Sequence, residues 1–439
     1  MDRAAMMPQS NVLVIAPLRM EREAELRSLL ASMNFIPGRV NPANPLLPFE
    51  QFPQLHFARF VILSDPTVDD IQKAYGISPP DYPLCLAFLA DFDGTADDFR
   101  ADLVRRAGAG LAQIFSFCQD FTPGTDIARW MKERDYPPAA IYVNWLGRTV
   151  QQIREENALR LALESHIQAK PAFFAEKSPR EVHAALREFM QAEIRAGRLT
   201  VTPPPPTPLG WWLGNAVHLI AVPLILLVLA PLLILYLPLF LIQLRRREKS
   251  DPEITTPVAL SYLAKTAALE DYDVTNQFTV IGAIKPGLFR LGTMRFLLWV
   301  LNWTARHIYI RGQLSRVETI HAARWVFIND RKRMIFASDY DSSVYTYMDD
   351  FINKIGWGLN LVFSNAVAYP TTRWLVLDGA KDEQNYKNNL HRHQLPTEVW
   401  YKAYLGLTVF DLKRNTLIRQ GIENAGLPET ALRQWLALF

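Results

Sequence analysis

Two stretches decide the fold: LHFARFVILSD at residues 55–65 and IHAARWVFIND at residues 320–330. In both, a His, an Ala, an Arg, an aromatic residue, a Val and an Asp stand in the same order, at an offset of 265 residues. Each stretch is short and apolar and is followed by an Asp, which is typical of a buried β-strand that ends in a turn. The match predicts that the chain contains two related halves.

Three further pairs of segments match in the same order: residues 12–19 with 278–285, 88–95 with 336–343, and 136–147 with 369–379. In the last pair, a Tyr-Pro at residues 136–137 is followed by an expected strand and Gly147, and a Tyr-Pro at residues 369–370 is followed by an expected strand and Gly379. Four matches in one order predict an internal duplication.

Each half is expected to contain a strand, a helix, two strands, a helix and a strand. In the first half we expect strands at residues 11–18, 56–64, 84–90 and 140–144, and helices at 21–33 and 97–119. In the second half we expect strands at residues 278–284, 322–328, 333–337 and 373–377, with a first helix at 288–308. The order βαββαβ is ferredoxin-like, with helices on one face of an antiparallel sheet. Because the other face must also be buried, we predict an α+β protein of two tandem ferredoxin-like modules packed sheet to sheet.

An uncharged segment separates the two halves. The chain has 439 residues with 47 basic and 44 acidic side chains, yet residues 199–244 contain no Asp, Glu, Lys or Arg. Trp211 and Trp212 stand near one border of the apolar run, and three arginines follow it at residues 245–247. These are typical membrane-interface anchors, so residues 211–244 are expected to lie in a lipid bilayer. The domains are therefore residues 1–198, a linker with the membrane segment at 199–249, and residues 250–439.

The membrane segment has two interpretations, one tilted span or a hairpin that turns near Pro231. Two sheets that pack on each other must lie on one side of the bilayer, which favours the hairpin with both modules cytoplasmic. Residues 288–308 form an aromatic and basic segment that lies in the membrane interface or covers the second sheet.

The repeated strand also supplies the candidate site residues. Alternation places Arg59 and Arg324 on the strand face opposite His56 and His321. A buried Arg needs an acidic partner, which we expect at the end of the next strand of the same half. The candidates are Asp91 and Asp93 for Arg59, and Asp339 and Asp341 for Arg324. Either these pairs tie strands together, or the arginines point into a cavity between the sheets and bind an anion or a bound oxygen species.

Other chemistry lacks sequence support. The sequence contains no Cys-x-x-Cys, His-Glu-x-x-His or Asp-rich metal loop, no phosphate-binding glycine loop and no Gly-x-Ser-x-Gly. We therefore expect no metal site. The net charge of only +3 argues against a nucleic-acid partner. A homo-oligomer remains an open alternative.

Two ferredoxin-like modules packed sheet to sheet resemble the dimeric α+β barrel superfamily, which includes dye-decolourising peroxidases and chlorite dismutases. The peroxidases carry Gly-x-x-Asp-Gly, whereas this chain has ADFDGT at residues 90–95 and SDYDS at 338–342. The resemblance implies a haem between the sheets. In that case Asp93 is the distal acid, Arg59 or Arg324 is the cation that polarises peroxide, and the iron ligand is His321, His391 or His393. Asp341, in the matching segment of the second half, is a further candidate catalytic residue.

Three functions follow from these features. The first is a redox enzyme, similar to a haem peroxidase, with its site between the sheets. The second is a non-enzymatic, membrane-anchored binding or scaffold module. The third is a pocket for a lipid-like ligand that is reached from the bilayer.

Overall fold

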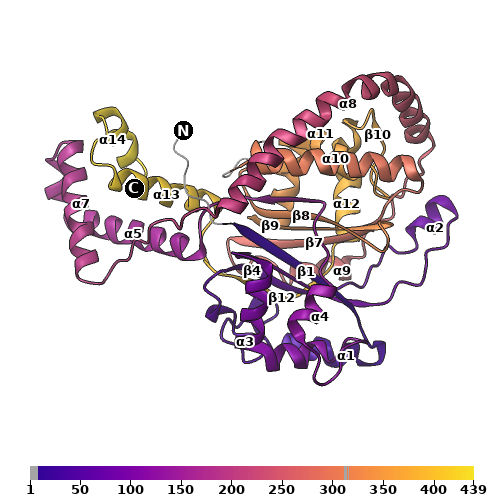
Figure 1. The fold of residues 1–439 in the computed structure, drawn as a ribbon, viewed down its shortest axis with the longest axis horizontal. Helices are drawn as coiled ribbons and strands as arrows, with labels where there is room; N and C mark the ends of the chain where they lie inside the picture. Colours follow the sequence, from indigo (N-terminus) through magenta and orange to yellow (C-terminus); the bar gives the residue numbers. More distant parts are fainter. Residues whose placement is uncertain (1–7, 311–313, 315) are drawn as a thin grey trace.

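The computed structural model describes residues 8–310, 314 and 316–439. It confirms the α+β class, because two four-stranded antiparallel sheets are surrounded by helices (Figure 1). The first sheet has the order β1-β5-β4-β12, and the second has the order β6-β8-β9-β7.

The sheet strands have the following bounds: β1 Gln9–Pro17, β4 Leu55–Ile62, β5 Cys85–Asp93, β6 Ala140–Val143, β7 Thr275–Ala283, β8 Ile320–Ile328, β9 Arg333–Asp341 and β12 Thr397–Lys402. Two small hairpins are formed by β2 (Asn34–Ile36) with β3 (Arg39–Val40), and by β10 (Thr372–Arg373) with β11 (Leu377–Asp378).

The α-helices have the following bounds: α1 Glu23–Ala31, α2 Asp70–Tyr75, α3 Ala96–Phe115, α4 Ile127–Glu133, α5 Val150–Ala169, α6 Pro171–Ala175, α7 Pro179–Arg195, α8 Leu209–Ser250, α9 Leu260–Ala267, α10 Leu288–His307, α11 Val344–Phe363, α12 Glu383–His393, α13 Val409–Glu423 and α14 Glu429–Leu436. Three short 3-10 helices lie at Met20–Arg22, Phe49–Gln51 and Gly379–Lys381.

Each sheet takes one edge strand from the other half of the chain. Strand β6 pairs with β8 of the second sheet, and β12 pairs with β4 of the first. The expected last strand at residues 373–377 is wrong, because positive φ angles at Trp374 and Leu375 fold that segment into the tight β10–β11 hairpin. The strand that replaces it is β12.

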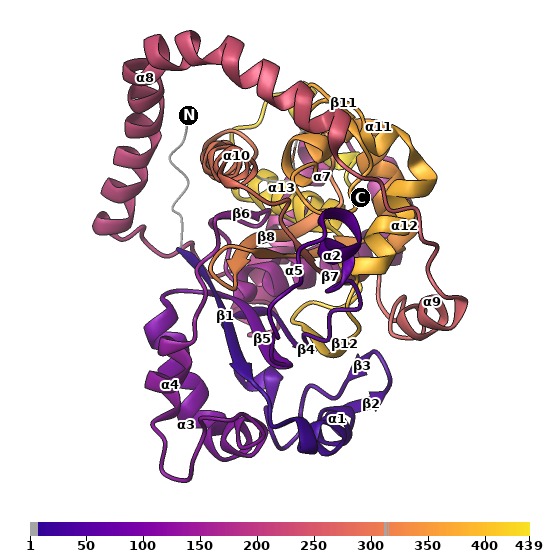
Figure 2. The same ribbon diagram turned by 90° about the vertical axis from the view of Figure 1, so that its right-hand side faces the viewer.

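The two sheets pack face to face. One cluster of buried residues draws on both of them, including Leu13, Val61 and Leu89 from the first sheet and Val326 and Ile335 from the second. Helices α1, α3 and α4 lie along the outer face of the first sheet, and α10, α11 and α12 along that of the second (Figures 1 and 2). The result is a four-layer body with a core between the sheets and one beneath each helical layer.

A helical extension projects from one end of the sheets, on the left in Figure 1. Helix α5 follows β6, α13 follows β12, and α6, α7 and α14 join them around a separate apolar cluster that contains Leu163, Leu186 and Trp435. His183 of α7 is buried there, with Nε2 at 2.9 Å from the carbonyl oxygen of Gly421.

Helix α9 is held beside the second sheet by a buried polar chain. The Tyr262 hydroxyl donates to the carbonyl oxygen of Gln394, and the Gln394 side-chain amide donates to Glu270 Oε1 at 2.7 Å. Burial raises the pKa of Glu270 to about 7 from its ordinary value of 4.5. The folded protein therefore favours the protonated carboxyl.

This raised pKa predicts a pH dependence of stability. Below pH 4.5 the carboxyl is protonated in both the folded and the unfolded chain, so no penalty exists. As pH rises from about 4.5 to about 7, the unfolded chain ionises first and the folded state loses about 3 kcal/mol. Denaturant titrations at several pH values should show this loss, and Glu270→Gln should remove it while it keeps an acceptor for Gln394. If the free energy of unfolding of Glu270→Gln falls with rising pH as steeply as that of the unchanged chain, Glu270 is not the cause of the loss.

Candidate functional site

The two repeated arginines lie between the sheets, as alternation predicted, but they pair across the interface. Arg59 forms an ion pair with Asp339 of the opposite sheet, and Arg324 forms one with Asp91. The expectation that each arginine pairs within its own half is wrong. The sheet faces meet so closely that the nearest carboxylate to each guanidinium stands on the facing sheet.

Each pair is extended to the partner sheet's backbone. Arg59 donates to the carbonyl oxygen of Phe278 at 3.2 Å, and Arg324 donates to that of Val12 at 3.1 Å. Asp339 accepts a further hydrogen bond from the Trp400 indole at 3.1 Å. The guanidinium groups thus donate to protein acceptors on the opposite sheet.

Burial shifts the pKa values of Arg59 and Asp91. Burial lowers the pKa of the Arg59 guanidinium, against the opposing effect of Asp339, and burial raises the pKa of Asp91, against the effect of Arg324. Both directions reflect the cost of removing an ion from water. The ion pairs offset that cost, and the buried charges restrict how the sheets can slide on each other.

The two histidines stand at irregular positions of their strands. The pairing registers of β4 and β8 each shift between the residue before the histidine and the residue after it, which marks a bulge at His56 and at His321. His56 Nε2 lies 3.1 Å from Asp93 Oδ1, and His321 Nε2 lies 2.7 Å from Asp341 Oδ1.

Asp93 and Asp341 have one structural role in common. The second carboxylate oxygen of Asp93 accepts from the Val150 amide at 2.9 Å, and that of Asp341 accepts from the Val409 amide at 2.6 Å. These amides are the first of helices α5 and α13. A carboxylate at a helix N-terminus satisfies an otherwise unpaired donor. Each aspartate therefore joins a strand histidine to the start of the helical extension.

The sequence carries a signal for this arrangement that we did not use. YVNWLGRTV at residues 142–150 matches YKAYLGLTV at 401–409, at an offset of 259. Each segment leaves an exchanged strand and enters a helix capped by Thr149 or Thr408. Gly147 therefore corresponds to Gly406 and not to Gly379.

The residues implied for a haem do not fit that group. His321 is fully buried, bonded to Asp341, and in contact with the rings of Phe57 and Tyr404. His393 Nδ1 lies 2.8 Å from the carbonyl oxygen of Asn389, and the ring borders a cavity of only about 40 Å³. That volume is close to the space of one water molecule. His391 lies on the same helix, with Nδ1 at 3.2 Å from Gln394 Oε1.

A larger cavity lies on the outer face of the second sheet, beneath α10 and α11. It holds about 220 Å³. Phe336 and Trp325 form its floor, Leu301 of α10 and Gly358 of α11 form its walls, and Trp357 lies at its border. Among the described residues that line it, none is charged. Such a lining accommodates an apolar group.

Helix α8 runs as one continuous helix past Pro223, Pro231 and Pro238. It forms an arch over α10, rising at the middle of Figure 1 and descending at the right. The expected hairpin turn near Pro231 is therefore wrong, since a proline inside a helix removes one hydrogen bond and bends the axis without ending it when its neighbours are good helix formers. We call this helix, Leu209–Ser250, the α8 arch.

The first end of the α8 arch is fixed to the last turns of α10. His218 Nδ1 lies 2.8 Å from His307 Nε2, and Arg306 donates to the Asn215 side chain at 2.6 Å. The Trp303 indole donates to the carbonyl oxygen of Leu219 at 3.3 Å. The helix is thus held before its most apolar part begins.

The second end is fixed near the start of α10. Glu248 is 2 % exposed and accepts hydrogen bonds from the Trp374 and Leu375 amides and from the Thr372 hydroxyl, all at 2.9–3.0 Å. Just after the helix, Asp251 forms ion pairs with Lys285 and Arg290. Both ends of the α8 arch therefore contact one body.

The middle of the arch is apolar and exposed. Seventeen large hydrophobic side chains between Leu213 and Ile242 are exposed, among them Leu227 at 70 % and Leu235 at 77 %. The α8 arch is long and apolar enough to cross a membrane, and it is the one helix in the described ranges with that property. In the same ranges, no group of three or more His, Cys, Asp or Glu side chains is placed to hold a metal ion.

Comparisons with protein families, with curated proteins and with solved structures give no match.

Breaking one cross-sheet ion pair should strongly destabilise the fold. Asp339→Ala leaves the Arg59 guanidinium buried without its carboxylate, and the expected loss is about 3–5 kcal/mol in the free energy of unfolding, measured by denaturant titration. Glu133→Ala, which removes an exposed ion pair with Arg129, should change little. The double variant Arg59→Met with Asp339→Leu should regain most of the loss, because neither charge remains. A single variant as stable as the Glu133 control would refute the role given to the pair.

Proposed function

We propose that the chain is a monotopic membrane protein in which the α8 arch enters the bilayer and leaves it on the same side, and that it serves as an anchored binding module. The observation that carries the proposal is that both ends of the arch bind one body while its middle exposes apolar side chains. A helix that crossed the bilayer would place its ends on opposite sides.

The lengths of the two helices support this placement. His218 is fixed to His307, and Asp251, directly after α8, is fixed to Arg290. Between His218 and Ser250, α8 covers about 48 Å along its axis, whereas α10 covers only about 26 Å between Arg290 and His307. The longer helix must bow away from the body. The bowed part carries the exposed leucines, and transfer of such apolar surface out of water is favourable by about 25 cal/mol per Å².

Helix α10 is a second membrane contact in this proposal. Leu288 is 87 % exposed and Phe296 is 42 % exposed, while Met294 and Leu298 are buried in the core above the second sheet. In this proposal α10 contacts the membrane interface and also covers the second sheet, which are the two interpretations given for residues 288–308. The arginines at 245–247 favour a cytoplasmic position for the body, since positive charge next to a membrane segment is typical of that side.

The body is best explained as two tandem ferredoxin-like modules that have exchanged their last strands. The supporting features are the repeated sequence segments, the crosswise Arg–Asp pairs, and the two His–Asp–amide arrangements. Direct contacts fill the space between the sheets. A binding or scaffold role therefore suits the body better than a redox reaction at Arg59, Arg324 or His321.

Site-directed labelling with a membrane-impermeant maleimide tests the topology. In a chain with Cys85→Ser and Cys118→Ala, single cysteines are placed at Pro206→Cys, before the arch, and at Lys249→Cys, in its last turn. Both should react in inverted membrane vesicles and neither in intact cells. Reaction of the two from opposite sides would establish a crossing helix and overturn the proposal.

Leu235→Cys provides the matched internal position. Its side chain is 77 % exposed on the protein but should be protected by lipid, so it should react only after detergent is added. Reaction without detergent would show that the α8 arch is not immersed.

A further inference from the structure

The outer faces of the two sheets have the same local geometry. Phe88 of β5 packs against Phe60 of β4 with ring centroids 4.8 Å apart, and Phe336 of β9 packs against Trp325 of β8 at 5.0 Å. In each sheet these are directly paired neighbours on the two central strands. Each aromatic pair lies beneath a long helix, α3 in the first sheet and α11 in the second.

The two covering helices also match. Each has 20 residues and is kinked at its twelfth, Ala107 in α3 and Ile355 in α11. A Gly-x-Gly follows each kink, at residues 108–110 and 356–358. Gly110 and Gly358 therefore occupy equivalent places on the inner side of the two helical layers.

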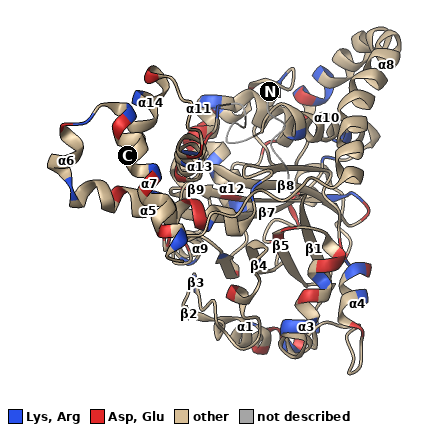
Figure 3. Ribbon diagram, turned by 60° about the vertical axis from the view of Figure 1, so that its left-hand side comes forward, with Lys and Arg blue, Asp and Glu red and all other residues tan. Residues whose placement is uncertain are grey.

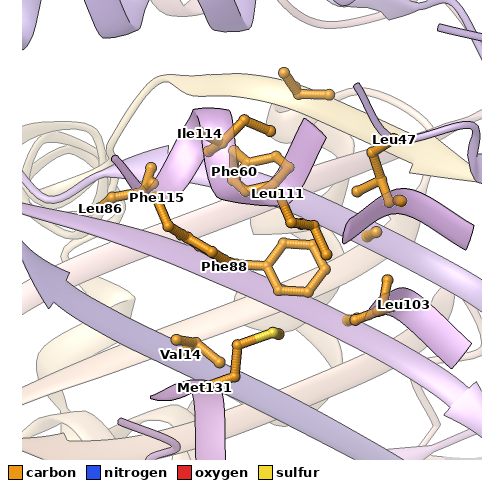
Figure 4. Close-up of a cluster of buried hydrophobic side chains, with 14 of the residues drawn as sticks. Val14, Leu47, Phe60, Leu86, Phe88, Leu103, Leu111, Ile114, Phe115 and Met131 are labelled. Carbon is orange, nitrogen blue, oxygen red and sulfur yellow. The ribbon is translucent and has the colours of Figure 1, made fainter. Parts of the chain in front are cut away.

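In the first half the chain fills this place with its own residues. A Cβ at Gly110 would lie 1.9 Å from the Leu46 carbonyl oxygen, so the backbone of the loop at residues 41–54 rests directly on the glycine. Leu47, Phe49 and Phe52 of that loop are fully buried. Figure 4 shows Leu47 in one cluster with Phe60, Phe88 and Leu111.

In the second half the equivalent place is the cavity of about 220 Å³. Its lining includes Trp325, Phe336 and Gly358, which correspond to Phe60, Phe88 and Gly110. Among the described residues, the nearest atom to a Cβ on Gly358 would be the Ile355 Cβ at 3.9 Å. The glycine that admits a peptide segment in one half thus borders open space in the other.

We propose that this cavity binds an acyl chain of an uncharged membrane lipid, in the place that the Leu46–Phe52 loop segment fills in the first half. The lipid source rests on the proposed membrane placement of the α8 arch, whereas the site itself does not.

The lining determines the ligand class. It offers no charged side chain to a carboxylate or phosphate, and its Thr304 hydroxyl already donates to the carbonyl oxygen of Leu301. An engineered apolar cavity of about 150 Å³ stays dry and binds benzene, so a larger apolar one suits a hydrocarbon chain. The side chains of Leu47 and its neighbours show that branched aliphatic and aromatic groups fit such a site.

The cavity also adjoins the proposed membrane surface. Leu297, Val300 and Leu301 line it from α10, and Phe296 on the same helix is 42 % exposed. On the α11 side, Trp357 is 50 % exposed. An acyl chain could pass between these two helices from the lipid without crossing a charged group of the lining.

Photolabelling tests the site. The protein is placed in phosphatidylcholine vesicles that contain a diacylglycerol with a diazirine in the middle of one acyl chain, and labelled peptides are mapped by mass spectrometry. Labels are expected on α8, and on the parts of α10 and α11 that line the cavity. Gly358→Leu places a side chain in the cavity and should reduce the α10 and α11 labels about tenfold, while the α8 label is retained.

Gly292→Leu is the matched control, because it makes the same change on an α10 residue with no atom within 4 Å. It should leave the cavity labels unchanged. Retention of the α10 and α11 labels in Gly358→Leu would overturn the site.

If Gly358→Leu fails to fold, as judged by its melting temperature, Leu301→Trp is used in its place, because it fills the cavity from the other wall. Retention of the α10 and α11 labels in Leu301→Trp would likewise overturn the site. Labels on the cavity residues of α10 and α11 without a label on α8 would support the site and contradict the membrane placement. A label on α8 alone would contradict the site and support the membrane placement.

Discussion

The two crosswise ion pairs between the sheets constrain the rest of the molecule. A guanidinium in the middle of a buried strand is costly unless a carboxylate and further acceptors surround it. Arg59 and Arg324 find both on the opposite sheet, at Asp339 and Asp91 and at the carbonyl oxygens beside them. Separation or sliding of the sheets would leave these charges unpaired. The interface is therefore fixed, and apolar side chains from both sheets pack within it.

The exchanged strands extend this constraint to the ends of the body. Because β6 and β12 each close the sheet of the other half, neither half completes its sheet without the other. Each exchanged strand continues into a helix whose first amide is held by Asp93 or Asp341. The carboxylate at the bulge thus couples strand exchange to the start of α5 or α13. This coupling explains why both aspartates are buried.

The sequence allowed accurate prediction of local elements and of strand faces, but it was less informative about partners. The stretch at residues 55–65 predicted both a strand and the side on which Arg59 lies, because alternation depends on the backbone alone. It could not predict Asp339 as the partner, since alternation says nothing about which sheet lies opposite. The Tyr-Pro match predicts the last strand at residues 373–377, and that prediction does not take into account the longer match at 401–409. Which sheet a strand joins depends on contacts between residues far apart in the sequence, so no short stretch of sequence predicts it.

The proposed function depends more on the differences between the halves than on their common features. Helix α1 has nine residues and leaves room for the loop that packs against Gly110, whereas α10 has 20 residues and extends across the outer face of the second sheet. That length lets α10 receive both ends of the α8 arch, and it also supplies one wall of the apolar cavity. One helix therefore joins the exposed apolar segment to the apolar cavity beneath α10 and α11. A shift of α10 would therefore change the shape of the cavity and the contacts of the arch together, because the helix contributes to both.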